Sequence, residues 1–353
     1  MRIFLTVNQG NATMVIANVV ITIAVTTTKR QTNKGDSMLF LGIDGGGTKT
    51  NFILMNEYGE TLGQETKGSA SHWQVDLSTA KKVLIDGTED VLRQAGKTWR
   101  DLTAVGYGMS GLGEDKEKDR RSIDLCHQIF SDIPIEIAND GEISLVATLQ
   151  FRPGINVVAG TGSIAFGRGK DGAVGRCGGW GHEIGDEGSA YWLGCRVLEL
   201  FTKQADGRRE KTLLYSLVKD YFQLEYDYQI MTRIQDEYYG QRSKIASLQM
   251  LLKEAAHGGD VEAQKVYEKA AEELIELVEG LRHQLTFSGD IPVTYSGSVF
   301  KAGDFFVAPF RNGLISRGFK PESKLGEPLL GAVLMAAQKV NQHDILLTSL
   351  KYG

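Results

Sequence analysis

The segment that most constrains the fold of this chain is LGIDGGGTKTNFILMNEYG, residues 41–59. An apolar run ends in Asp44, three consecutive glycines follow, and a second apolar run begins after Thr48. Apolar runs of that length bounded by turn residues predict two β-strands joined by a tight turn. Because glycine has no Cβ, the N–H groups of such a turn can approach an anion closely. The segment therefore predicts a hairpin whose turn can hold a phosphate group.

The spacing of the glycines narrows this prediction. Residues 44–50 contain neither GxGxxG opening a helix nor GxxxxGK[ST], so they match neither dinucleotide-binding nor P-loop folds. An ordinary hairpin with a glycine-rich turn is the alternative. Asp44, at the end of the strand, is placed to hold Mg²⁺ through water beside the phosphates. The residues predicted to bind the nucleotide here are Asp44, Gly45, Gly46, Gly47, Thr48 and Lys49.

Composition excludes several other classes of protein. The chain has 353 residues, enough for two domains or one large one. Lys plus Arg number 39 against 44 Asp plus Glu, a net charge of −5, so no basic surface for nucleic acid is indicated. The three cysteines, Cys126, Cys177 and Cys195, are far apart and lack CxxC spacing. This pattern predicts a reducing, cytoplasmic location and no membrane partner.

The first 37 residues differ in composition from the rest. Residues 14–25 are mostly apolar, and a polar stretch follows at 29–37. The apolar part is short for a transmembrane helix and is interrupted by Asn18 and Thr22, and its start lacks a basic signal-peptide region. A weak signal or anchor, an added strand or disordered arm, and an upstream start codon are the three interpretations. We favour the last, with residues 1–37 dispensable, because a start at Met38 would place the first core strand at the N-terminus.

Alternating elements predict an α/β architecture. Helices are expected over 78–95, with Ser78 as the N-cap, and over 115–130. After Gly185 the pattern becomes helical over 189–203, 211–222, 243–256 and 261–285, and a last helix over 326–340 has small residues suited to close packing. The strands are expected at 39–43, 51–55, 104–108, 135–138, 156–159, 164–167 and 292–296.

A second turn repeats the features of the first. Gly160, Thr161, Gly162 and Ser163 follow one apolar run and precede another, as residues 44–48 do. Two similar α/β halves, each contributing one phosphate-binding hairpin to a shared cleft, would explain the repetition.

Four ordered motifs resemble the actin, hexokinase and heat-shock chaperone superfamily. They are IDGGGTKT at 43–50, IEIANDGEISLVA at 135–147, VVAGTGSIAFG at 157–167 and VTYSGSVFKAGDFF at 293–306. Two more segments, Ser71-His72-Trp73 and CGGWGHEIGDEGSAYW at 177–192, resemble the BadF/BadG/BcrA/BcrD ATPase family, most closely its N-acetylglucosamine kinases. The resemblance extends from Leu39 to about Val340.

The resemblance implies an ATP- and Mg²⁺-dependent kinase that phosphorylates the 6-hydroxyl of N-acetylglucosamine or a close relative. It implies two ribonuclease-H-like domains with a cleft between them: 38–152 joined by the C-terminal helix 326–343, and 153–325 with a helical insert. A homodimer is allowed. Asp140 would be the catalytic base, and Gly297 and Ser298 would join the two turns in binding ATP. The residues implied to bind the sugar are Ser71, His72, Trp73, Asn139, Asp140, Gly179, Trp180, Gly181 and Asp186.

Alternatives remain at this stage. Animal N-acetylglucosamine kinases carry Asn where this chain has Ser71, so glucosamine and N-acetylmuramic acid stay open as substrates. Asp140 as a plain helix N-cap and the two tryptophans as core residues are the structural alternatives. The same family also contains ATP-driven activators of 2-hydroxyacyl-CoA dehydratases and benzoyl-CoA reductases, which hold an iron–sulfur cluster between two subunits. An idle sugar sensor is a third hypothesis, which the presence of Asp44 and Asp140 disfavours.

Overall fold

The computed structural model describes residues 4–8, 11–16, 19–24 and 37–352. The chain forms two separate compact units, Met1–Ser37 and Met38–Gly353. In the first unit, β1 (Phe4–Asn8), β2 (Asn11–Ile16) and β3 (Val19–Ala24) form an antiparallel sheet in that order. The polar stretch noted at 29–37 lies outside the described residues apart from Ser37. None of the helices described is long and apolar enough to cross a membrane.

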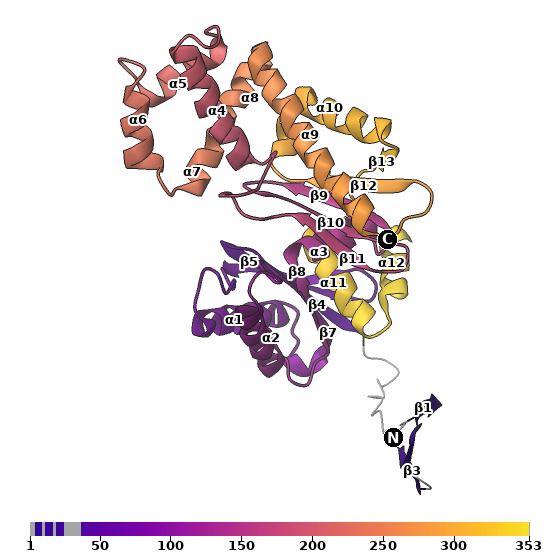
Figure 1. Cartoon of the computed structure of the whole chain (residues 1–353). Coiled ribbons are helices and arrows are strands. Elements are labelled where there is room, and N and C mark those ends of the chain that lie inside the picture. Colours follow the sequence, from indigo (N-terminus) through magenta and orange to yellow (C-terminus); the bar gives the residue numbers. More distant parts are fainter. Residues whose placement is uncertain (1–3, 9–10, 17–18, 25–36, 353) are drawn as a thin grey trace. The chain divides into compact units, whose positions relative to one another are not determined.

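Two five-stranded sheets with the same strand order form the framework of the second unit (Figure 1). The first has the order β6-β5-β4-β7-β8, in which β4, β5 and β6 are antiparallel and β4, β7 and β8 are parallel. The second, β11-β10-β9-β12-β13, repeats this arrangement. The strands are β4 (Leu39–Gly45), β5 (Lys49–Asn56), β6 (Thr61–Gly68), β7 (Leu102–Met109), β8 (Ile135–Asn139), β9 (Gly154–Ala159), β10 (Ser163–Arg168), β11 (Val174–Gly178), β12 (Ile291–Ser296) and β13 (Phe319–Pro321).

This repeat accounts for the two similar turns in the sequence. The hairpins β4–β5 and β9–β10 occupy equivalent positions in the two sheets, and each turn carries one of the glycine-rich segments. The α/β class expected from the alternation of strands and helices is therefore the class observed.

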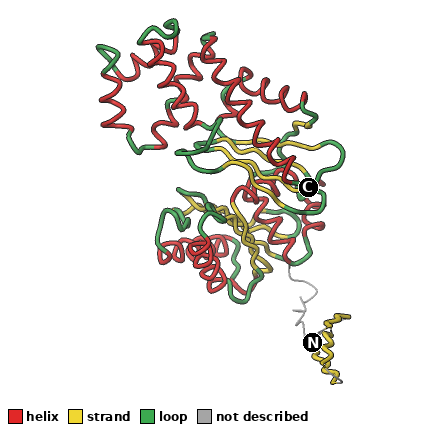
Figure 2. The backbone as a smooth tube through the Cα atoms, in the orientation of Figure 1, coloured by secondary structure: helices red, strands yellow, loops and turns green. Residues whose placement is uncertain are grey.

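Helices lie outside the sheets and between them, and most of the helices after β11 gather beyond the second sheet (Figure 2). Those before β11 are α1 (Leu77–Gln94), η1 (Trp99–Asp101), α2 (Lys116–Ile129) and α3 (Asp140–Leu149). Those after it are α4 (Ala190–Ala205), α5 (Leu213–Phe222), α6 (Gln229–Arg233), the π-helical turn η2 (Ile234–Tyr238), α7 (Arg242–Ser247), α8 (Gln249–His257), α9 (Val261–Gln284), η3 (Val299–Lys301), α10 (Asp304–Ser316), α11 (Pro328–Lys339) and α12 (His343–Tyr352).

The C-terminal helix α11 returns to the first sheet, where it packs against β4, β7 and α3. The approach is close because a Cβ at Gly331 would overlap the carbonyl oxygen of Ile143 in α3. Small residues on α11 thus allow the close packing expected of them. Helix α3 in turn contacts β7 of the first sheet and β9 and β10 of the second, which places its N-terminus where the two halves meet.

Two local predictions need correction, and some strands of the two five-stranded sheets were missed. The N-cap of α1 is Asp76, whose carboxylate accepts the N–H of Thr79, and Ser78 instead donates its hydroxyl to Asp76. The helix expected over 243–256 is two helices, α7 and α8, which meet at Leu248, and the apolar spacing continues through that junction without marking it. Strands β6, β11 and β13 were not predicted: β6 and β11 have half-exposed, glycine-containing sequences without an apolar run, and β13 has only three residues.

Candidate active site

The β4–β5 turn presents backbone groups at the end of the first sheet. Gly46 N–H donates to the carbonyl of Lys49 at 2.9 Å, which closes the turn, and Gly47, Thr48 and Lys49 are exposed. A Cβ at Gly45 would lie 2.8 Å from the Tyr107 hydroxyl oxygen, so this position requires glycine for the close approach of two strands. The free N–H groups of the turn are available to an anion.

Asp44 stands at the end of β4, directly opposite Asn51 on β5. Burial raises the pKa of its carboxyl, while Asn51 Nδ2, which donates to the carboxylate at 3.4 Å, and the charge of Lys49 oppose that rise. A carboxylate whose burial is so weakly compensated by the protein is one that a cation would stabilise.

The second turn, Gly160–Ser163, is fixed by the start of α4. The carbonyls of Gly160 and Thr161 accept the N–H groups of Ala190 and Tyr191 at 2.9 and 3.2 Å, and Gly160 N–H donates to Gly162 O at 2.9 Å. The Ser163 hydroxyl donates to the carbonyl of Glu187 at 2.6 Å. The turn is therefore held by the segment that leads into α4.

Asp140 is the first residue of α3, and Asn139 rather than Asp140 is the N-cap. The amide oxygen of Asn139 accepts the N–H of Gly141 at 2.8 Å, and its Nδ2 donates to Leu112 O at 2.8 Å. Burial is the main cause that raises the pKa of Asp140, and the charge of Asp44 raises it further, against a hydrogen bond from Ser110. Because Asn139 already caps α3, the Asp140 carboxylate is not the N-cap, and the interpretation of Asp140 as a plain N-cap is wrong.

The segment between β11 and α4 is irregular because its backbone takes left-handed conformations at Gly178, Gly179 and Gly181, with φ of 75°, 70° and 88°. Trp180 between them is 73% exposed. Asp186 also has a positive φ, 59°, and its side chain is 3% exposed. Its carboxylate accepts the N–H of Ser163 at 3.2 Å and forms an ion pair with Arg242.

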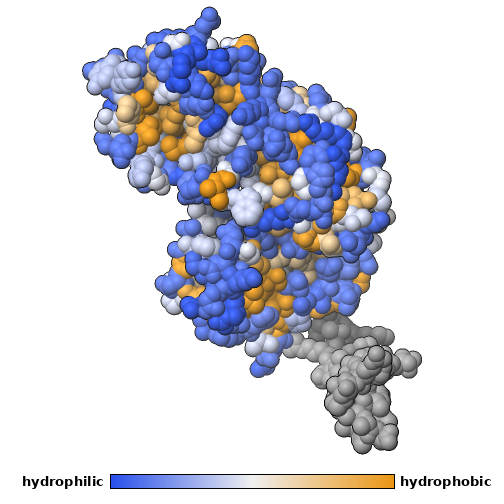
Figure 3. Space-filling view, in the orientation of Figure 1, coloured by the Kyte–Doolittle hydropathy of each residue, from blue (hydrophilic) through white to orange (hydrophobic). Residues whose placement is uncertain are grey.

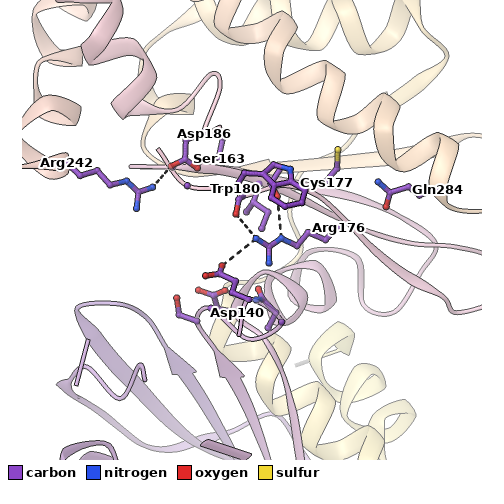
Figure 4. Close-up of a pocket in the computed structure, with 18 residues that line it drawn as sticks. Asp140, Ser163, Arg176, Cys177, Trp180, Asp186, Arg242 and Gln284 are labelled. Carbon is purple, nitrogen blue, oxygen red and sulfur yellow. Dashed lines mark hydrogen bonds and ion pairs between the residues drawn. The ribbon is translucent and has the colours of Figure 1, made fainter. Parts of the chain in front are cut away.

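These elements surround a pocket of about 800 Å³. The surface is hollowed between the helical part and the first sheet (Figure 3). From the first half the pocket is lined by Ser110, Gly111, Gly113, Glu114, Asn139 and Asp140, and from the second by Gly162, Ser163, Ile164, Arg176, Cys177, Gly178, Gly179, Trp180, Gly181, Asp186, Arg242 and Gln284. In Figure 4, the Arg176 side chain lies between Trp180 and Asp140, while Arg242 and Asp186 point toward one another on the other side of Trp180.

Eight predicted residues line this pocket: Asn139, Asp140, Gly162, Ser163, Gly179, Trp180, Gly181 and Asp186. Ser71, His72 and Trp73 do not line it. Ser71 and the His72 side chain are buried, and Trp73 packs behind Gly111 with Lys118 over its ring at 3.6 Å. The first turn, Gly160, Thr161, Gly297 and Ser298 also lie outside the lining.

Sequence reasoning missed five polar residues of the pocket: Ser110, Glu114, Arg176, Arg242 and Gln284. Arg176 directly precedes the CGGWG segment, so its position beside that motif was a usable signal. Ser110 follows β7 at the sheet edge where Asp44 and Asp140 also lie, which was another. Arg242 comes from α7, 56 residues after Asp186, and no local pattern connects the two.

The three cysteines lie in different parts of the fold and are not grouped together. Cys126 is fully buried in the core beside the first sheet, and Cys177 and Cys195 are partly buried against the core beside the second. Among residues 37–352, no three His, Cys, Asp or Glu side chains are grouped as metal ligands.

Known proteins are similar to this chain in sequence. Residues 41–336 match the BadF/BadG/BcrA/BcrD ATPase family. An N-acetylmuramic acid/N-acetylglucosamine kinase of Clostridium acetobutylicum is 30% identical over 300 residues, which cover 84% of this chain and 97% of that protein. An N-acetyl-D-glucosamine kinase of Dictyostelium discoideum is 29% identical over 271 residues, covering 73% and 84%.

A solved structure is similar to this chain in fold. A candidate N-acetylglucosamine kinase from Chromobacterium violaceum superposes with a TM-score of 0.65 at 27% identity, covering 84% of this chain and 98% of the other. The resemblance drawn from the motifs is thus confirmed, as is the fold of two ribonuclease-H-like halves. The chain belongs to the BadF/BadG/BcrA/BcrD ATPase family.

Proposed function

We propose that this protein is an ATP-dependent amino-sugar kinase that transfers the γ-phosphate to the 6-hydroxyl of N-acetylglucosamine or a close relative. One observation carries the proposal: Asp140, the predicted base, lines the same pocket as Ser163 of the second phosphate turn and the CGGWG segment. The names of the relatives from Clostridium acetobutylicum and Dictyostelium discoideum support the same reaction. Phosphoryl transfer needs mainly positioning and charge stabilisation, which such a pocket supplies.

The nucleotide is bound by the two hairpin turns, 44–49 and 160–163, with Gly297 and Ser298. Gly297 has a φ of 114°, and a Cβ there would overlap the carbonyl oxygen of Ala159, so this loop lies directly against the end of β9. The three segments thus lie at the strand ends, where N–H groups can screen the phosphates from two sides.

The residues present fit a Mg²⁺ ion beside Asp44. Its carboxylate is half-buried, and only a long hydrogen bond from Asn51 and the charge of Lys49 compensate this burial; its own charge acts on the neighbouring Asp140. Mg²⁺ is commonly held by one or two carboxylates together with phosphate oxygens and waters, so Asp44 alone among the protein groups is sufficient. When bound, the ion neutralises phosphate charge.

Asp140 orients the acceptor hydroxyl and takes its proton. The carboxylate is fixed by Gly141 N–H, which donates to Oδ1 at 3.0 Å, and by Ser110. Its raised pKa makes it a stronger proton acceptor than an exposed aspartate, provided that it is ionised.

The sugar ring is held from the second half. Trp180 offers an apolar ring face to the pyranose or its acetyl group, and Gly179, Gly181 and Asp186 offer polar groups, while Asn139 lines the pocket from the first half. The segment Ser71-His72-Trp73 shapes the opposite wall, since Trp73 packs on Gly111, a lining residue.

The experiment is an ATP-consumption assay with glucose, glucosamine, N-acetylglucosamine, N-acetylmannosamine and N-acetylmuramic acid. We expect turnover with N-acetylated amino sugars. Strong preference for a sugar without nitrogen would overturn the acceptor but not the kinase reaction, and no sugar-dependent turnover would overturn both.

A further inference from the structure

Arg176 is a charged pocket residue that the reaction proposed above does not use. It lies on β11, and its side chain is 28% exposed. Its Nη2 donates to the carbonyl of Gly179 at 2.6 Å and its Nε donates to that of Gly178 at 3.3 Å. Because two carbonyls of its own segment hold it, the guanidinium is fixed at the pocket wall before any ligand arrives.

The acidic partner of Arg176 is loosely bound. Glu114, on the loop after β7 in the other half, places Oε1 3.5 Å from Nη2, and its side chain is 42% exposed. Charge-assisted hydrogen bonds are normally about 2.7–2.9 Å long, and exposed ion pairs contribute little free energy. A carboxylate brought by a ligand can therefore replace Glu114, and the planar guanidinium suits a two-point contact with it.

The remaining charges of the pocket already have roles. Arg242 is paired with Asp186, so it is less available to an anionic group. The Asp140 carboxylate is the proposed acceptor of the proton from the sugar hydroxyl. The pocket also continues past Arg176 to Cys177 and Gln284, which leaves room for a substituent beside the sugar ring (Figure 4).

We propose that Arg176 binds the carboxylate of an acidic amino sugar, the lactyl ether group of N-acetylmuramic acid, and so decides whether acidic acceptors are used as well as neutral ones. The inference rests on the proposed kinase function. A neutral hexosamine offers no group that needs a guanidinium, whereas a lactyl carboxylate buried without a cation would be strongly disfavoured.

The test is the ratio of kcat/KM for N-acetylmuramic acid to kcat/KM for N-acetylglucosamine, which does not depend on the fraction of folded enzyme. Arg176→Gln is expected to lower this ratio about 10- to 100-fold, the effect of losing a hydrogen bond between charged groups. Glu114→Gln removes the competing carboxylate and should keep or raise the ratio. Arg120→Gln, on the exposed face of α2, is the matched control and should leave it unchanged. With the methyl ester of N-acetylmuramic acid, which has no carboxylate charge, wild type and Arg176→Gln should have similar kcat/KM values.

Other outcomes overturn the inference. If Arg176→Gln left the ratio of the two kcat/KM values unchanged, the inference would be wrong. Equal losses of kcat/KM on both sugars in Arg176→Gln and in Glu114→Gln would mean that the Arg176–Glu114 ion pair only joins the two halves. Wild-type turnover of N-acetylglucosamine without N-acetylmuramic acid would remove the inference and leave the kinase function intact. Turnover of neither sugar would remove both.

Discussion

The carboxylate of Asp186 accepts a hydrogen bond from the backbone N–H of Ser163 at 3.2 Å. The residue implied to bind the sugar is therefore bonded to the turn implied to bind ATP. Asp186 holds a left-handed backbone, and its side chain is almost fully buried beside Arg242. A backbone conformation of this kind is kept only where its surroundings determine it, and it is common at ligand sites.

This bond predicts that Asp186→Ala affects both substrates. Loss of the acceptor leaves Ser163 N–H unpaired and the second turn less well fixed, at a cost of about 1–3 kcal/mol. We expect KM for ATP to rise together with KM for the sugar in steady-state kinetics. Asp186→Asn, which keeps an acceptor oxygen, should retain more of the ATP affinity. A rise confined to the sugar KM would contradict this coupling.

Asp140→Asn should abolish turnover and raise thermal stability at neutral pH. General base catalysis accounts for about 10² to 10⁴ in rate. The raised pKa means that the folded state binds the Asp140 proton more tightly than the unfolded state does, so the ionised carboxylate lowers stability above that pKa. The gain in Tm over wild type should therefore shrink as pH falls through the raised pKa. A lower Tm for the variant at pH 7 would contradict this account.

The same shift predicts the acid side of the pH–rate profile. Since Asp140 must be ionised to accept a proton, kcat should fall as pH is lowered through its folded pKa, which lies above the usual value of about 3.9. The midpoint of the acid limb, measured with saturating sugar and ATP, should lie above that of an exposed aspartate. A profile flat down to pH 4 would show that this group does not act as the base.

Gly297→Ala should destabilise the fold and weaken ATP binding. The residue has a φ of 114°, and a Cβ there would overlap Ala159 O. Such strain costs about 1–3 kcal/mol, visible as a lower midpoint in urea unfolding. Gly68→Ala is the control, because it has open space and an ordinary φ, and it should stay near wild type. Equal effects of the two substitutions would argue against close contact between β12 and β9 at this loop.

A chain that begins at Met38 should keep its activity. We propose that residues 1–37 are dispensable and that the kinase consists of domain 38–152 with helix 326–343 and domain 153–325. The division of the chain into compact units at Ser37 supports the first point. Loss of sugar phosphorylation after truncation would contradict it, and N-terminal sequencing of the native protein would show where translation begins.

Much of the fold is readable in the sequence because strands such as Leu39–Gly45 are continuous apolar runs that end at glycine-rich turns. The position of Asp140 at a strand-to-helix junction is readable as well, whereas its proposed role as the base was inferred from the resemblance of that junction to the superfamily motif. Strand β11 cannot be predicted from the sequence in this way, because half-exposed residues at a sheet edge do not form an apolar run. The pairing of Arg242 with Asp186, and of Arg176 with Glu114, arises from packing between distant segments, which no local pattern records.

The most direct test of the central claim is phosphorus NMR of a reaction with ATP, Mg²⁺ and N-acetylglucosamine. The account predicts a phosphate ester on the 6-oxygen and one equivalent of ADP with wild type, and no ester with Asp140→Asn. Inorganic phosphate without an ester, an ester on another oxygen, or an Asp140→Asn rate close to wild type would contradict it.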